Sequence, residues 1–106
     1  MEAYEAAKLI EQLKSRSDGY LEFLRVPALS AGLYSLPAGG TDPQQPHSED
    51  EIYHVIRGAA VLKAGDVHHE IRPGSIVFVP ARQAHAFHSI AEDLLVLVVF
   101  APAENG

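Results

Sequence analysis

The sequence contains no cysteine and no tryptophan among its 106 residues. Without cysteine, disulfide bonds and thiolate metal ligands are excluded. Lysine and arginine number 8 against 14 aspartates and glutamates, which gives a net charge of −6 and no basic cluster. Nucleic acid and anionic membrane surfaces are therefore poor candidate partners. No apolar run approaches the roughly 20 residues that span a bilayer, and no signal-peptide pattern opens the chain, so we expect a cytoplasmic protein.

Hydrophobic residues make up 47% of the chain, which is enough for one domain with a packed core. Residues 1–16 carry apolar side chains at helical spacing. After this helix, short apolar runs alternate with glycine and proline turns, as is typical of an antiparallel sandwich or barrel. We expect a helix and turn over residues 1–19, one β-domain over 20–101 and a loose tail over 102–106. The individual strands are expected at residues 20–26, 29–36, 52–57, 59–64, 67–71, 75–79, 83–89 and 94–100.

Residues 39–58 combine metal-ligand residue types with strand-like spacing. Gln45, His47 and Glu51 are even numbers of residues apart, so in an extended chain their side chains project from one face. Amide oxygen, imidazole nitrogen and carboxylate oxygen are all metal-ligand types. His85, which follows a short apolar run and a proline, is a further candidate ligand.

These residues fall within two motifs that resemble those of the cupins. The first runs from glycine through five residues to Gln45-Pro46-His47, then three residues, Glu51, six residues and glycine. In it, Gln45 stands where a first histidine is usual. The second motif is matched over residues 74–89, where Arg82 replaces a glycine and Ser89 an asparagine. The resemblance implies an all-β fold, the double-stranded β-helix or jelly-roll barrel, with the short helix added at its N-terminus.

The resemblance also implies a metal site inside the barrel. It would hold one divalent ion, Fe, Mn, Ni or Zn, on Gln45, His47, Glu51 and His85. Two histidines and one carboxylate leave coordination positions open, and the amide would add a weak neutral donor. A metal-free barrel whose polar residues hydrogen-bond one another is the alternative.

Strand alternation extends the expected site to its neighbours. If Glu51 faces the interior, Tyr53 and Val55 do so too, and Phe87 shares the parity of His85. These three residues would line a pocket, and Glu51 and Tyr53 are candidate acid–base groups.

The opposite row of the same strand, formed by Ile52, His54 and Ile56, would face outward and is apolar enough to need cover. The chain's own layers, the N-terminal helix or a second subunit could supply it. Small cupins are commonly dimers, so the resemblance favours a homodimer.

Six other polar residues have weaker expectations. His54 and His88 should face away from the site, and Glu49 is expected to be solvated. His68 and His69 are expected on a solvated edge, with a second metal site as the alternative. Arg82 is expected at the surface, unless it reaches a substrate carboxylate or phosphate.

Three functions remain open from the sequence. The first is a metal-dependent enzyme on a small molecule, with a dioxygenase-like activity favoured. The second is a sugar or polyol isomerase or epimerase, and the third is a non-catalytic module that binds a small ligand. A cupin fold by itself does not choose among them.

Overall fold

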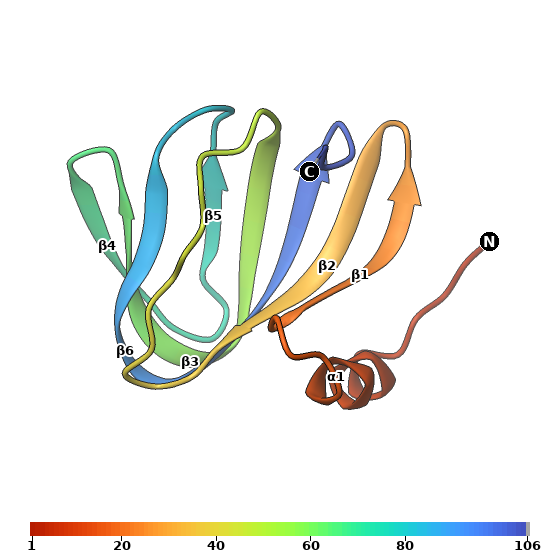
Figure 1. Ribbon diagram of the computed structural model, residues 1–106, viewed down its shortest axis with the longest axis horizontal. Coiled ribbons are helices and arrows are strands. Elements are labelled where there is room, and N and C mark those ends of the chain that lie inside the picture. Colours follow the sequence, from red (N-terminus) through yellow and green to blue (C-terminus); the bar gives the residue numbers. More distant parts are fainter. Residues whose placement is uncertain (106) are drawn as a thin grey trace.

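The computed structural model describes residues 1–105, which form one helix and six strands. The elements are α1 (Ala6–Lys14), β1 (Tyr20–Val26), β2 (Leu29–Leu36), β3 (Asp50–Ala64), β4 (Val67–Ile71), β5 (Ile76–Val79) and β6 (His85–Ala101). All paired strands are antiparallel, in the order β1-β2-β6-β3-β4, with β5 also paired to β3. The sheet curves round on itself to enclose an interior, while α1 lies against its outside (Figure 1). The predicted all-β fold with a short N-terminal helix is confirmed.

Strands β3 and β6 are longer than the sequence predicted. Each was expected as two strands, but they run for 15 and 17 residues and pair with each other along most of that length. Both bend instead of breaking, and the ladder shifts register around Gly58. Gly58 has φ +95, and a Cβ there would overlap the carbonyl oxygen of Asp93 on β6. The close passage of β3 over β6 therefore requires glycine at this position.

The interior of the sheet follows the predicted alternation along β3. Glu51, Tyr53 and Val55 are only 2%, 1% and 1% exposed, and they face the inside of the barrel. Val96 and Phe87 of β6 lie in the same buried cluster. This alternation brings the carboxylate of Glu51 into the interior of the barrel.

Helix α1 covers part of the outer face. Leu9 and Leu13 pack on Leu33 and Leu95, and Ile56 at one end of the outward row joins this cluster. The helix begins at Ala6, later than predicted, because the buried stripe starts only with Leu9. Within residues 1–105, no helix has the length and apolar character needed to cross a membrane.

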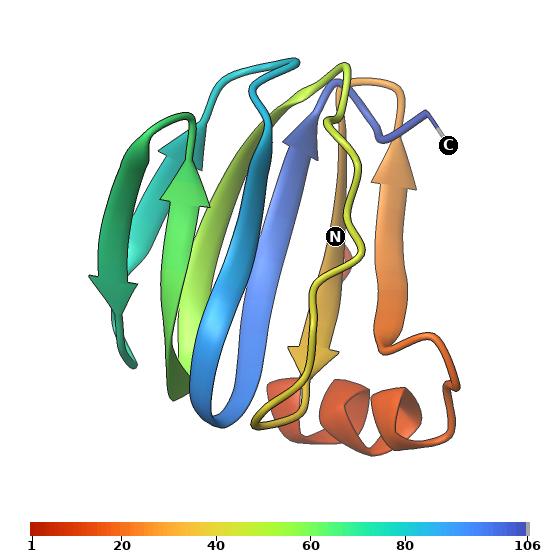
Figure 2. The same ribbon diagram turned by 60° about the vertical axis from the view of Figure 1, so that its left-hand side comes forward.

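The segment between β2 and β3, residues 37–49, contains no strand although it runs lengthwise beside β6 (Figure 2). Gly39 N–H donates to the Ile90 carbonyl at 2.9 Å, and Phe87 N–H donates to the Asp42 carboxylate at 2.9 Å. Near its end, the His47 carbonyl accepts from Arg82 N–H. The segment thus lies along the free edge of the first half of β6.

Candidate metal centre

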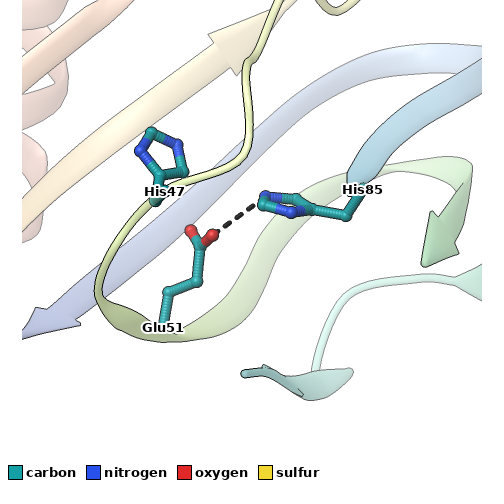
Figure 3. A group of neighbouring side chains, drawn as sticks. All are labelled: His47, Glu51 and His85. Atoms are coloured by element: carbon teal, nitrogen blue, oxygen red, sulfur yellow. Dashed lines mark ion pairs between the residues drawn. The ribbon is translucent and has the colours of Figure 1, made fainter. Parts of the chain in front are cut away.

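Three side chains from three separate parts of the chain converge inside one end of the barrel (Figure 3). His47 comes from the segment before β3, Glu51 from the start of β3, and His85 from the start of β6. One donor atom of each lies within 4.8 Å of the others. The predicted convergence of these three residues is therefore present in the structure.

His85 is held between two oxygen acceptors. Its Nε2 lies 2.9 Å from Glu51 Oε1, and its Nδ1 donates to the Gln83 carbonyl oxygen at 2.9 Å. Burial lowers the pKa of His85, but the hydrogen bonds to Glu51 and Gln83 outweigh it and leave the pKa above its usual value. The Gln83 contact fixes the ring so that Nε2 faces Glu51, as an outer hydrogen bond does for histidines that bind metals.

Glu51 supplies the observation that tests whether a cation fits. Its side chain is 1% exposed, and its second oxygen, Oε2, is buried without any hydrogen-bond partner. A buried carboxylate oxygen without a partner is costly. Together with two imidazoles, this oxygen makes a donor set that suits a divalent transition metal. The residues present therefore fit the metal that the cupin resemblance implies.

The amide that reaches this group belongs to Gln44, whereas Gln45 is exposed. Gln44 Oε1 lies 3.2 Å from His47 Nε2 and accepts from the Tyr53 hydroxyl at 3.1 Å. Asp42 accepts from Gln44 Nε2 at 2.8 Å, which turns the amide oxygen towards the histidine. The alternation that selected Gln45 fails because residues 41–47 are irregular rather than extended strand.

Tyr53 places its hydroxyl among these donors. The oxygen is 3.1 Å from both His85 Nε2 and Gln44 Oε1. Burial, followed by the charge of Glu51, raises the pKa of Tyr53 far above its usual value. Phe87 packs edge-on against the Tyr53 ring at 5.0 Å, and Val55 lies in the same cluster. The predicted pocket residues thus form the packed wall behind the donors.

His47 marks the side from which solvent reaches the group. Its side chain is 18% exposed, whereas Glu51 and His85 are 1% exposed. On this side, His47 Nδ1 lies 3.1 Å from Glu104 Oε2 in the C-terminal segment. Sequence patterns had given no reason to place Glu104 here, since the segment was expected to be a loose tail.

Comparison with known proteins agrees with this architecture. The family model described as "Cupin domain" matches residues 32–100. The chain belongs to the cupin family. An uncharacterized Streptomyces coelicolor protein is 46% identical over 105 residues, which is 99% of this chain and all of that protein.

Solved structures show the same cupin fold. DMSP lyase DddQ from Ruegeria pomeroyi is 28% identical, with a TM-score of 0.67 over 72% of this chain and 39% of that chain. This cupin therefore spans well under half of DddQ. KdgF from a Halomonas species has a TM-score of 0.71 at 23% identity, over 78% of this chain and 76% of that one. A putative mannose-6-phosphate isomerase from Ralstonia eutropha has a TM-score of 0.69 at 21% identity, over 79% and 83%.

The other polar residues considered in the sequence are not members of the donor group. Arg82 is exposed, with φ +66 at the position where the motif has glycine. His54 is also exposed. His68 Nδ1 on β4 is 2.9 Å from His88 Nε2 on β6 at the exposed outside. Glu49, expected to be solvated, is instead 4% exposed.

The structure also contains a cleft that is separate from the donor group. A cleft of about 460 Å³ opens near the bend of β3 and β6, and none of its lining residues belongs to the donor group. It is lined by Ala59, Ala60, Val61, Glu70, Ile71, Arg72, Ser89 and Ala91. The residues that line this cleft do not form a set of converging ligands comparable to His47, Glu51 and His85.

Proposed function

We propose that this cupin is a divalent-metal-dependent enzyme that transfers a proton on a small molecule, in a reaction of the lyase or isomerase type. The observation that carries the proposal is the position of the Tyr53 hydroxyl, 3.1 Å from His85 Nε2 and from Gln44 Oε1. A phenol at this place can exchange a proton with a substrate held at the donor group.

The proposed ligands are His47, Glu51 and His85, with Gln44 in place of Gln45 as the neutral donor. Two neutral imidazoles and one carboxylate leave a net positive charge on a divalent ion, and positions remain open for a substrate oxygen. When bound, the ion would act as a Lewis acid that polarises that oxygen.

Tyr53 supplies the proton-transfer group in this proposal. Burial and Glu51 keep its pKa high, so the hydroxyl holds its proton at neutral pH until a substrate and a cation change its surroundings. Phe87 packs edge-on against the Tyr53 ring and excludes water behind it. The similarity to a DMSP lyase and to a putative sugar-phosphate isomerase supports a proton transfer without specifying the substrate.

An oxygenase is the second candidate, because two histidines and one carboxylate are also the ligand set of non-haem iron oxygenases. A non-catalytic ligand-binding module is the third outcome. Metal analysis of protein purified without chelators or a metal column separates them. Iron near one per chain with substrate-dependent oxygen uptake supports the oxygenase, and turnover without oxygen uptake supports proton transfer. A chain that takes up no metal contradicts both enzyme proposals.

The Tyr53→Phe variant is expected to bind the metal as wild type does and to lose most of its catalytic activity. The phenylalanine preserves the packing against Phe87 and removes only the hydroxyl, so we expect a fall in kcat of roughly 10²- to 10⁴-fold. DMSP and hexose 6-phosphates serve as probes, and NMR in D₂O measures product formation and hydrogen–deuterium exchange at carbon. Tyr4→Phe, which removes an exposed hydroxyl before the N-terminal helix, is the control. Equal rates for wild type and Tyr53→Phe would exclude the phenol as the acid–base group.

We further propose that a second copy of the chain covers the outer face of β3 and β5. Ile52, Ile76 and Phe78 are 46%, 72% and 59% exposed there, and Ile52 pairs directly with Phe78 across the strands. In a two-fold dimer, such an apolar patch is buried against the same patch of the second subunit. The patch continues onto β6 through Val99, which pairs with Ile52.

Phe78→Asp is expected to convert the dimer into a folded monomer, because the carboxylate would be desolvated in the contact. Light scattering over a range of concentrations measures the mass, and circular dichroism checks the fold. Val67→Asp, at a residue of β4 that is 68% exposed outside this patch, is the control and should leave the dimer intact. A monomeric wild type at every concentration would refute the contact.

A further inference from the structure

The C-terminal segment after β6 is docked on the barrel. Ala103 N–H donates to the Pro27 carbonyl at 3.3 Å, and Glu104 N–H donates to Ser30 Oγ at 2.9 Å. Ser30 is 0% exposed, so its hydroxyl serves this contact away from solvent. Asn105 N–H reaches Glu49 Oε2 at 3.3 Å. These three contacts hold the segment against the β1–β2 turn, the start of β2 and the residue before β3. Gly106 lies outside the described residues.

This docking carries the Glu104 carboxylate to His47. Glu104 Oε2 is 3.1 Å from His47 Nδ1, and both side chains are about one-fifth exposed, at 21% and 18%. A carboxylate only accepts hydrogen bonds, so Nδ1 is the donor in this contact. The other nitrogen, Nε2, faces the Gln44 amide oxygen, which is also an acceptor, and it would have to be free of its proton to bind a metal.

The two histidines are therefore arranged alike. His85 uses Nδ1 to donate to the Gln83 carbonyl, and His47 uses Nδ1 to donate to Glu104. In each case an acceptor outside the donor group fixes the ring and leaves Nε2 turned inward. Such outer acceptors set the tautomer of metal-binding histidines and increase their basicity.

We infer that Glu104 is a positioning residue for the metal ligand His47, so that the C-terminal segment is part of the metal site. The inference rests on the proposed metal site, and it concerns the orientation of His47 rather than direct coordination by Glu104. It assigns to the last residues of the chain a role that the two cupin motifs do not contain.

The test measures metal affinity in wild type, Glu104→Ala and Glu104→Gln by calorimetric titration with Zn²⁺ and Ni²⁺. Outer hydrogen-bond partners of metal ligands are typically worth 10- to 100-fold in affinity, and we expect a loss in this range for Glu104→Ala. Glu104→Gln keeps an acceptor oxygen without the charge and should fall between the two. Glu92→Ala removes an exposed carboxylate elsewhere and should bind as wild type does.

A second readout needs no metal. Long-range ¹⁵N–¹H NMR of the metal-free protein should show His47 protonated at Nδ1, and this bonded proton should be lost in Glu104→Ala. If wild type binds neither ion, the metal site itself is refuted. If wild type binds and Glu104→Ala binds equally well with an unchanged His47 ring, only the role of Glu104 is refuted.

Discussion

Replacing His85 by alanine is expected to abolish metal binding and to lower the free energy of unfolding by about 3 kcal/mol, the lower end for breaking a buried ion pair. The imidazole and the Glu51 carboxylate face each other at 2.9 Å with side chains 1% exposed. Without His85, the carboxylate has neither its partner nor a complete metal site. The chain should still fold, because this loss is smaller than the stability of a typical domain.

Two measurements check this expectation. Calorimetric titration with Zn²⁺ should show at least a roughly 100-fold loss of affinity, in line with removal of a direct ligand rather than an outer partner. Urea unfolding gives the change in stability. His54→Ala, which removes an exposed histidine from β3, should change neither. Full metal occupancy in both His85→Ala and His47→Ala would show that the ligands are assigned wrongly.

Gly58→Ala is expected to cost about 3 kcal/mol of stability or more, the second large effect. The backbone at Gly58 has φ +95, where an L-residue is strained, and its new Cβ would also lie 2.7 Å from Leu94 Cα. Both obstacles are backbone, so no side chain can move to relieve them. Residues on both sides of Gly58 pair with β6, so a backbone shift that relieved the contact would disturb this ladder.

Gly39→Ala separates the two contributions. Gly39 also has a positive φ, +74, but a Cβ there meets nothing within 4 Å. Its loss should be only about 1 kcal/mol, the cost of the left-handed conformation alone. Urea unfolding of both variants gives the comparison. Equal losses would mean that the close passage of β3 over β6 is unimportant for stability.

The regular parts of this fold were predictable because their signals are local. Strand β1, strand β2 and strand β4 begin and end where the apolar runs and turn residues indicate. Alternation along β3 predicted that Glu51 and Tyr53 point inward, since a residue period of two is a property of the strand itself. The convergence of His47 and His85 with Glu51 followed from the spacing of the two cupin-like motifs instead, because His47 precedes β3 and His85 begins β6.

The errors occur where the backbone is irregular or where distant segments meet. Gln45 was selected by a strand period in a segment that forms no strand, and Gln44 is oriented instead by Asp42. Glu104 reaches His47 through contacts with the β1–β2 turn, and no local pattern encodes such docking. Glu49 is buried for a related reason, because it accepts a hydrogen bond from Asn105 in that same segment.

The segment of residues 37–49 seals the edge of β6 with only a few backbone contacts, so most of its residues are released from ladder geometry. An unsealed edge would be open to pairing with other chains, and here it is protected without a further strand. Donor identity at position 44 can therefore vary independently of sheet hydrogen bonding. A substitution at this position can therefore change the donor group while the strand pairing of the barrel stays the same.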